Sequence, residues 1–267
     1  MTQTLRSVAI GFVALAAIVG VSAAAAYSQK AQAATTVASG DLIRGETFSA
    51  VYYMGADGFR YVFPNDKTYF TWYSDFDDVK WITDTELGRI QIGGNVTYKP
   101  GVKMIKINTD PKVYVVDEGG TLSAIGSEAD ATTLYGSTWN KKIDDVADAF
   151  FSNYTLTGTS VNASIWTAAS ATAGTTTINV DKALTAPETI SITDDGFSPL
   201  DVTIEAGETV RFTNNDTTKH AATGDNGKWG TGTLNPGDSY VIEFKTAGTF
   251  AFTDSYDESN TGAIFVE

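Results

Sequence analysis

The stretch that decides the fold is GTFAFTDSYDESNTGAIFVE, residues Gly248–Glu267. Phe250 and Phe252 alternate with small or polar residues, which predicts a strand over Thr249–Thr253 with one face in a core. The apolar run Ala263–Val266 predicts a second strand that closes the domain. Asp254–Thr261, between them, is polar apart from one tyrosine and is expected to form a loop.

The same pattern extends upstream to residue 187. Gly-containing turns at Asp195-Gly196, Ala206-Gly207 and Pro236-Gly237 separate further short strands of alternating apolar residues. Those strands are expected at Thr189–Thr193, Asp201–Glu205, Thr209–Asn214, Ala221–Thr223, Gly230–Leu234 and Ser239–Lys245. Eight short strands at this spacing predict a Greek-key β-sandwich domain over residues 187–267.

Three phrases of this domain resemble plastocyanin and EfeO-type cupredoxins: GFSPLDVTIEAGETVRFTNNDTTKHAA (196–222), LNPGDSYVIEFKTAGTFAFTD (234–254) and TGAIFVE (261–267). The resemblance covers the whole segment. It implies a copper domain in which one upstream His and a Cys, a His and often a Met of the last loop bind the metal. His220 falls at the upstream His, Asp254 at the Cys, Asp257 at the second His and Asn260 at the Met.

The usual chemistry of that family needs residues that this chain lacks. A type-1 copper site uses a thiolate and two imidazoles, but the chain contains no Cys and one His. Electron transfer by type-1 copper is therefore excluded, and we expect no cofactor. Two interpretations of His220 stay open. It binds copper or another divalent cation together with Asp254, Asp257 and Glu258, or it forms a salt bridge or hydrogen bond with Asp254, which would raise its pKa.

Residues 41–158 predict two copies of a small β module, at 41–103 and 104–158. Short aromatic strands form a hairpin, and a short helix follows, beginning at Pro64–Asp66 in the first copy and at Ser127–Asp130 in the second. The repeated positions lie 62 residues apart: Val51-Tyr52 and Val113-Tyr114, Gly58 and Gly120, Tyr73 and Tyr135. Ile82–Asp84 is also matched with Ile143–Asp145. Each copy is too small to bury its own apolar face, so the two copies are expected to pack together or to pair strands.

The first copy is dense in aromatic residues, eleven of which fall between Tyr52 and Trp81. One interpretation is a platform for carbohydrate or wall polymers; the other is that the rings fill the core of a small module. The hairpin pattern resembles modules of bacterial surface and wall-associated proteins. That resemblance implies an extracellular, non-catalytic role.

The remaining segments concern export and linkage. Residues 1–33 combine Arg6, the apolar run Val8–Val21 and two A-x-A sites, which predicts a signal peptide cleaved before Ala34. The alternative is an uncleaved membrane anchor; either way the rest of the chain is exported to the periplasm, the cell surface or the medium. Residues 159–186, rich in Thr, Ser and Ala, predict an extended linker.

The net charge and the motifs of the sequence exclude several classes of function. The net charge of −14 makes nucleic acid and anionic membrane surfaces unsuitable partners. The negative charge serves to keep the protein soluble, or alternatively to collect divalent cations at its surface. No phosphate loop, nucleophile elbow or zinc-protease helix occurs, and no pair of carboxylates stands out for glycan hydrolysis. The sequence thus predicts a mainly β, non-enzymatic protein of the cell envelope or the extracellular space. Its partner would be an envelope polymer or protein, and metal binding is the alternative function.

Overall fold

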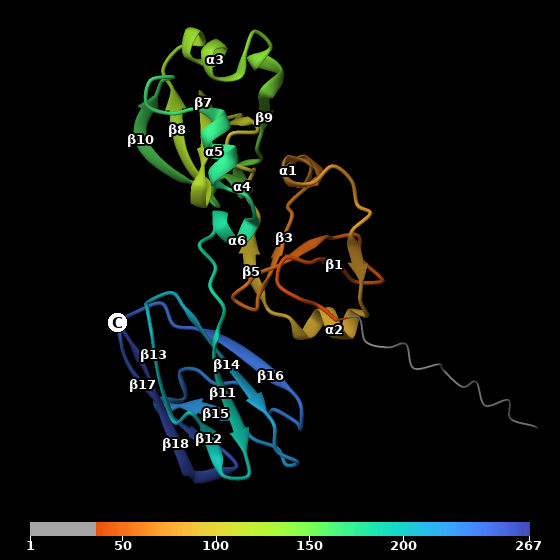
Figure 1. Ribbon diagram of the computed structural model, residues 1–267, viewed down its shortest axis with the longest axis vertical. Coiled ribbons are helices and arrows are strands. Elements are labelled where there is room, and N and C mark those ends of the chain that lie inside the picture. The colour runs from red at the N-terminus through yellow and green to blue at the C-terminus, as the bar shows by residue number, and fades with distance from the viewer. Residues whose placement is uncertain (1–35) are drawn as a thin grey trace, which may run out of the picture. The chain divides into compact units, whose positions relative to one another are not determined.

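The computed structural model describes residues 36–267 (Figure 1). The predicted signal peptide lies outside the described residues. Within residues 36–267, no helix combines the length and the apolar character needed to cross a bilayer.

The first sheet contains five short strands in the order β4-β1-β2-β3-β5. Its elements are β1 (Leu42–Arg44), β2 (Tyr52–Met54), β3 (Arg60–Val62), α1 (Asp66–Trp72), β4 (Val79–Trp81), α2 (Asp84–Arg89) and β5 (Ile92–Asn95). The predicted start of α1 is confirmed, because the Asn65 side chain accepts a hydrogen bond from the Thr68 amide at 2.9 Å. Helix α2 begins with a capping box formed by Thr83 and Glu86.

The second sheet has the strand order β10-β8-β7-β6-β9. Its elements are β6 (Met104–Ile107), β7 (Asp110–Asp117), η1 (Glu118–Gly120), β8 (Thr121–Ile125), α3 (Glu128–Tyr135), η2 (Trp139–Lys142), β9 (Ile143–Asp145), α4 (Asp148–Phe151) and β10 (Thr155–Val161). Ser127 caps α3 as predicted, by accepting a hydrogen bond from the Asp130 amide.

The two sheets follow the same plan. Each has a central antiparallel hairpin, and each outer strand joins its neighbour in parallel. Tyr52 faces Val62 in the first hairpin, and Tyr114 faces Ala124 in the second, so both hairpins keep the spacing of 62 residues.

One predicted correspondence between the two sheets is wrong. Ile82–Asp84 does not match Ile143–Asp145, because Val79 pairs with the start of β1 as Ile143 pairs with the start of β6. Ile82 corresponds instead to Val146, since the amide of each donates to the last paired residue of the neighbouring strand. Two extra residues between Tyr135 and β9, compared with the interval from Tyr73 to β4, account for the shift.

The segment expected to be an extended linker is partly helical. It begins inside β10 and then contains α5 (Ala168–Gly174) and α6 (Ile178–Asp181). Ile178 is fully buried in the core of the first sheet. The polar composition of the segment conceals this, because a helix of one turn is too short to give a periodic apolar signal.

Two four-stranded sheets make up the carboxy-terminal sandwich, with the orders β12-β11-β14-β16 and β13-β18-β17-β15. The strands are β11 (Glu188–Thr193), β12 (Gly196–Ser198), β13 (Asp201–Ile204), β14 (Thr209–Asn214), β15 (Ala222–Gly224), β16 (Ser239–Glu243), β17 (Gly248–Asp254) and β18 (Asp257–Val266), with the turn η3 (Asp225–Gly227). The chain crosses repeatedly between the sheets, which is the Greek-key arrangement. The expected strand Gly230–Leu234 is reduced to two isolated bridges.

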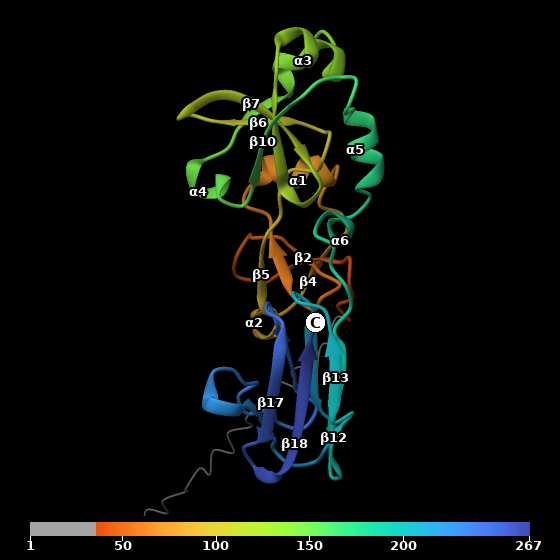
Figure 2. The same ribbon diagram turned by 90° about the vertical axis from the view of Figure 1, so that its left-hand side faces the viewer.

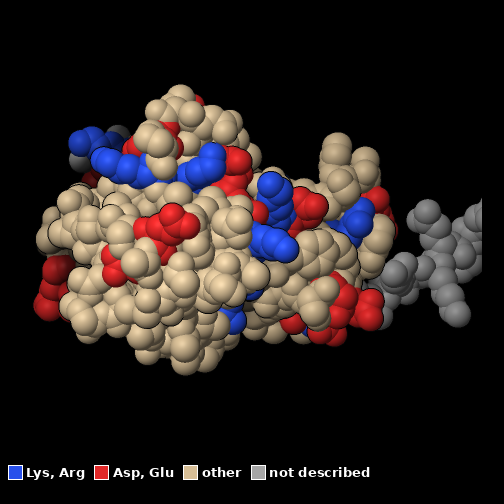
Figure 3. All heavy atoms as spheres, turned by 90° about the horizontal axis from the view of Figure 1, so that it is seen from above, with Lys and Arg blue, Asp and Glu red and all other residues tan. Residues whose placement is uncertain are grey.

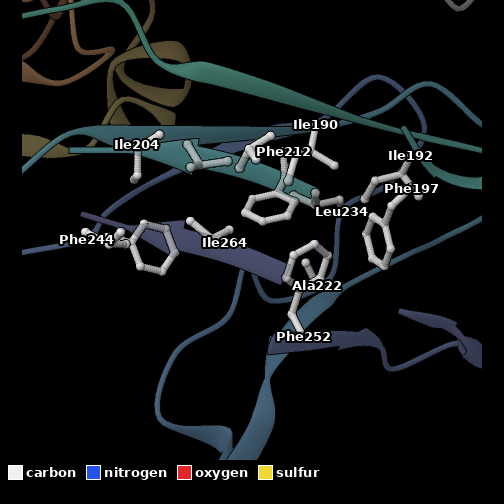
Figure 4. Close-up of a cluster of buried hydrophobic side chains, with 13 residues drawn as sticks. Ile190, Ile192, Phe197, Ile204, Phe212, Ala222, Leu234, Phe244, Phe252 and Ile264 are labelled. Carbon is white, nitrogen blue, oxygen red and sulfur yellow. The ribbon is translucent and has the colours of Figure 1, made fainter. Parts of the chain in front are cut away.

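The core lies between these two sheets, and apolar side chains from both point into it (Figure 4). The predicted alternation is confirmed at Val202, Ile204, Val210, Phe212 and Phe252, all of which are buried. The rings of Phe212 and Phe252 meet edge to face with centroids 5.3 Å apart. Such a core requires no metal to hold the sheets together.

The predicted polar loop Asp254–Thr261 is wrong. Strand β18 begins at Asp257, so only Ser255 and Tyr256 form the turn, and β17 and β18 run side by side as a long hairpin (Figure 2). The Asp254 carboxylate accepts a hydrogen bond from the Tyr256 amide at 3.0 Å, which is the usual way that Asp stabilises a tight turn.

Candidate functional site

His220 lies between β14 and β15, at the edge of the sandwich. Its backbone exchanges two hydrogen bonds with Leu234, at 3.1 and 2.8 Å. The residue is 9% exposed. The ring is therefore held in a nearly dry position by a fixed backbone.

Both nitrogens of the His220 ring contact carboxylates. Nδ1 lies 2.5 Å from Oδ2 of Asp254, and Nε2 lies 2.9 Å from Oδ2 of Asp216. Thr218 Oγ donates a hydrogen bond to Asp216 and lies 3.1 Å from Nε2. Only a protonated imidazole can donate from both nitrogens, so this arrangement suits the imidazolium.

Asp254 is fully buried but well satisfied. Its Oδ1 accepts from the Ala221 and Tyr256 amides, each at 3.0 Å, while Oδ2 faces His220. One carboxylate thus joins the start of β15 to the end of β17. A buried charge with these partners is stabilised by two amide hydrogen bonds and one cation.

The surroundings favour the charged form of His220. Burial by itself would lower the pKa of His220, but hydrogen bonds to Asp216 and Asp254 outweigh it and raise this pKa. The bonds from His220 and Thr218 in turn lower the pKa of Asp216. The contacts with Asp216 and Asp254 and the raised pKa of His220 therefore both favour the imidazolium form of the ring.

The other predicted site residues are placed differently. Asp257 lines the same hollow as His220, and its carboxylate accepts hydrogen bonds from the amide and the hydroxyl of Ser259, which lower its pKa. Glu258 is exposed on β18. Asn260 accepts a bond from the Phe197 amide at 3.1 Å and so joins β18 to β12.

Asp216 was missed by the sequence reasoning, although it stands four residues before His220. The turn Asn214-Asn215-Asp216 gave a signal. Asn214 is fully buried, and its side chain accepts from the Asp216 amide and donates to the Thr218 carbonyl. These bonds fold the loop back, which brings the Asp216 carboxylate onto the ring.

The donor set does not fit the copper centre that the fold implies. The chain has no thiolate, and its one imidazole uses both nitrogens for carboxylates that lie on opposite sides of the ring. A metal held by one nitrogen would have to displace a hydrogen-bonded carboxylate. Among residues 36–267, no three His, Asp or Glu side chains are grouped in a way that could hold a metal ion.

The two packed sheets and the upstream histidine define a cupredoxin-like β-sandwich. Comparison with protein families agrees, because residues 160–266 match the family described as a cupredoxin-like domain. The chain therefore contains a cupredoxin-like domain in its carboxy-terminal part. No curated protein gave a match to this sequence.

Several solved structures resemble this domain. A purple cupredoxin from Nitrosopumilus maritimus is 26% identical, with 30% of this chain and 99% of that chain covered and a TM-score of 0.28. A copper-containing nitrite reductase from Thermus scotoductus is 25% identical, with 31% of this chain and 23% of the reductase chain covered and a TM-score of 0.30. Amicyanin from Paracoccus versutus is 26% identical, with 30% and 81% covered and a TM-score of 0.28.

Proposed function

We propose that this is an exported, non-catalytic protein of the cell envelope or the extracellular space. In this proposal the cupredoxin-like domain is a copper-free scaffold or binding module. The amino-terminal sheets contact envelope material, either a polymer or another protein. The predicted signal peptide and the absence of a recognisable catalytic motif from the sequence support this function.

The main support for the proposal is that both ring nitrogens of His220 contact carboxylates. In a copper protein of this fold, the upstream histidine must offer a lone pair to the metal. Here Asp254 contacts Nδ1 and Asp216 contacts Nε2. An internal ion pair thus does the structural work of joining β15 to β17, without a metal.

We further propose that the two amino-terminal sheets arose by tandem duplication. Identical strand order, equal hairpin register and helix caps at equivalent places, Asn65 and Ser127, support a common origin. Repeated modules commonly supply extended binding surfaces rather than a single catalytic cleft.

The charge distribution suits a role as a soluble surface protein. On the face seen in Figure 3, acidic and basic groups are interspersed among wide uncharged areas. Mixed charge of this kind favours solubility over binding to one highly charged polymer. Lys106 and Asp145 illustrate it, since they form an ion pair at 2.5 Å on neighbouring strands.

Copper titration tests the proposal. Adding Cu²⁺ to the full chain is expected to give no intense thiolate-to-copper absorption, and any binding detected by calorimetry is expected to be the same in wild type and in His220→Ala. A metal complex whose electron paramagnetic resonance spectrum contains imidazole nitrogen couplings that vanish in His220→Ala would contradict it.

The second candidate is a divalent-cation function, which is suggested by acidic side chains that line a hollow with His220, although no three of them within residues 36–267 are grouped so as to hold a metal ion. Asp194, Asp195, Asp216 and Asp257 line a hollow of about 870 Å³ with His220. Calorimetry with Zn²⁺, Mn²⁺ and Ca²⁺ separates the candidates. Saturable heat that is lost in Asp257→Asn would favour the cation site, and no heat would leave the scaffold function.

A further inference from the structure

The first module carries a cluster of aromatic rings that its own core does not account for. Tyr69 is buried and forms the centre, with Phe76 stacked on it at a centroid distance of 4.3 Å. Phe70 meets both rings edge to face, at 5.4 Å from Tyr69 and 5.3 Å from Phe76. Phe70 and Phe76 are nevertheless 49% and 48% exposed. Two large apolar side chains are thus held in fixed positions and offered to solvent.

The second module shows that its fold does not need these rings. The hairpins and helix caps of the two modules correspond, so Tyr69 stands where the second module has Ala131, and Phe70 where it has Thr132. The following loop of the second module contains Trp139, but this residue packs against that module's apolar cluster. The exposed ring of Phe70 on α1 is therefore not required by the fold that the two modules share.

A hollow lies next to the rings. It has a volume of about 470 Å³, within the range of ligand sites, and Phe63, Tyr69 and Phe76 supply aromatic lining. Polar groups share the wall, including Asn65, Asp66, Ser49 and Asn95. The hollow thus combines flat apolar faces with hydrogen-bonding groups.

We propose that this hollow and the rings of Phe70 and Phe76 bind a neutral saccharide chain. A sugar ring has an apolar face of C–H groups, which suits an aromatic ring, and a rim of hydroxyls, which suits amides and carboxylates. A wholly apolar partner would leave the polar wall without hydrogen bonds. An anionic polymer would be repelled by Asp66 and by Asp75 and Asp77, which flank Phe76 in the chain.

This inference rests on the proposed envelope role and names its binding site. The test is calorimetric titration of the full chain with three neutral hexasaccharides: cellohexaose, chitohexaose and maltohexaose. We expect saturable binding of at least one. Phe76→Ala and Phe70→Thr, which copies the second module, should each weaken it by about tenfold, as expected for the loss of a stacked ring. Phe265→Ala removes a phenylalanine of the sandwich that is 40% exposed and should change the affinity less than twofold.

Folding is checked separately by the thermal midpoint of each variant, and Phe70→Thr is the decisive one because its side chain is half exposed. The proposal is overturned if none of the three sugars binds, if the ring variants bind as well as wild type, or if a cationic peptide binds through the rings while no sugar does. Sedimentation with envelope fragments distinguishes a failure of the saccharide site from a failure of the proposed envelope role. Binding to fragments that survives in Phe70→Thr would overturn the sugar site and leave the envelope role standing.

Discussion

At the scale of single residues, His220 is held by two carboxylates from separate parts of the sandwich, Asp216 after β14 and Asp254 at the end of β17. Its ring lies between Asp216 and Asp254, and the second of these is wholly buried. A buried carboxylate without a cation would be costly, whereas a carboxylate with a cation and two amide donors is well compensated. The contribution of Asp216, His220 and Asp254 to the stability of the sandwich therefore depends on the charge of the His220 ring.

Stability should fall as the pH rises through the pKa of His220. This pKa is raised in the folded protein, so the ion pair contributes fully below the unfolded value of about 6.5 and is lost as the pH rises through the folded value. NMR titration should give a pKa above about 6.5. Urea unfolding between pH 6 and 9 should show a decline of at most about 1.4 kcal/mol per pH unit.

His220→Ala is the matched variant for this measurement. It should cost about 3–5 kcal/mol at pH 6, because it leaves the Asp254 charge buried without a cation, and it should lack the decline with pH. Asp254→Asn keeps the shape of the side chain and removes one of the two charges beside the ring, so it should reduce the decline but not abolish it, because Asp216 still raises the pKa of His220. A pKa of His220 at or below the ordinary value, or an unchanged decline in both variants, would refute the charged network.

At the scale of helices and strands, the sequence predicts the strands that show an alternation of apolar residues and the helix starts that carry a capping residue. All the expected strands of the sandwich except Gly230–Leu234, the hairpins of both modules and the start of α1 follow from local patterns and are found in the structure. The tight turn of the last hairpin was not predicted, because the polar residues Asp254–Thr261 have the composition of a loop, whereas β18 begins at Asp257 and pairs with β17. Likewise the pairing of Asp216 with His220 depends on the loop folding back, which spacing alone does not reveal.

The helical linker illustrates the same limit. Asp181 is buried beside Ile178 on α6, and it accepts hydrogen bonds from Thr97 at 3.1 Å and from the Gly119 amide at 3.2 Å. Both partners are distant in sequence. A polar one-turn segment became ordered because tertiary contacts fix it, and helix propensity alone would not have sufficed.

Ile178→Ala should therefore destabilise the protein, although it lies in an apparent linker. Ile178 is fully buried, and truncation of a buried isoleucine costs about 2–5 kcal/mol. Val180→Ala on the same helix is the control, because Val180 is 40% exposed and should cost less than about 1 kcal/mol. Urea denaturation and limited proteolysis of residues 159–186 measure both. Equal, small effects of the two substitutions would mean that α6 is not part of the module core.

At the scale of the whole molecule, the acidic excess should oppose folding. The chain carries 32 Asp and Glu against 18 Lys and Arg. Compact folding brings like charges closer than they are in the unfolded chain. Ion pairs such as Lys80–Asp41, at 2.7 Å, are partly exposed and offset little of this repulsion. Screening by salt should therefore favour the folded state.

We expect the unfolding temperature at pH 7.5 to rise by about 2–4 °C between 10 and 300 mM NaCl, which corresponds to about 1 kcal/mol for a chain of this size. The rise should shrink near pH 4, where many carboxylates are protonated. Scanning calorimetry measures both, and a flat or falling midpoint at pH 7.5 would contradict the repulsion. The matched control is MgCl₂ or CaCl₂ at equal ionic strength. General screening predicts similar midpoints for all three salts, whereas a larger rise that Asp257→Asn abolishes would point to a cation held in the acidic hollow beside His220.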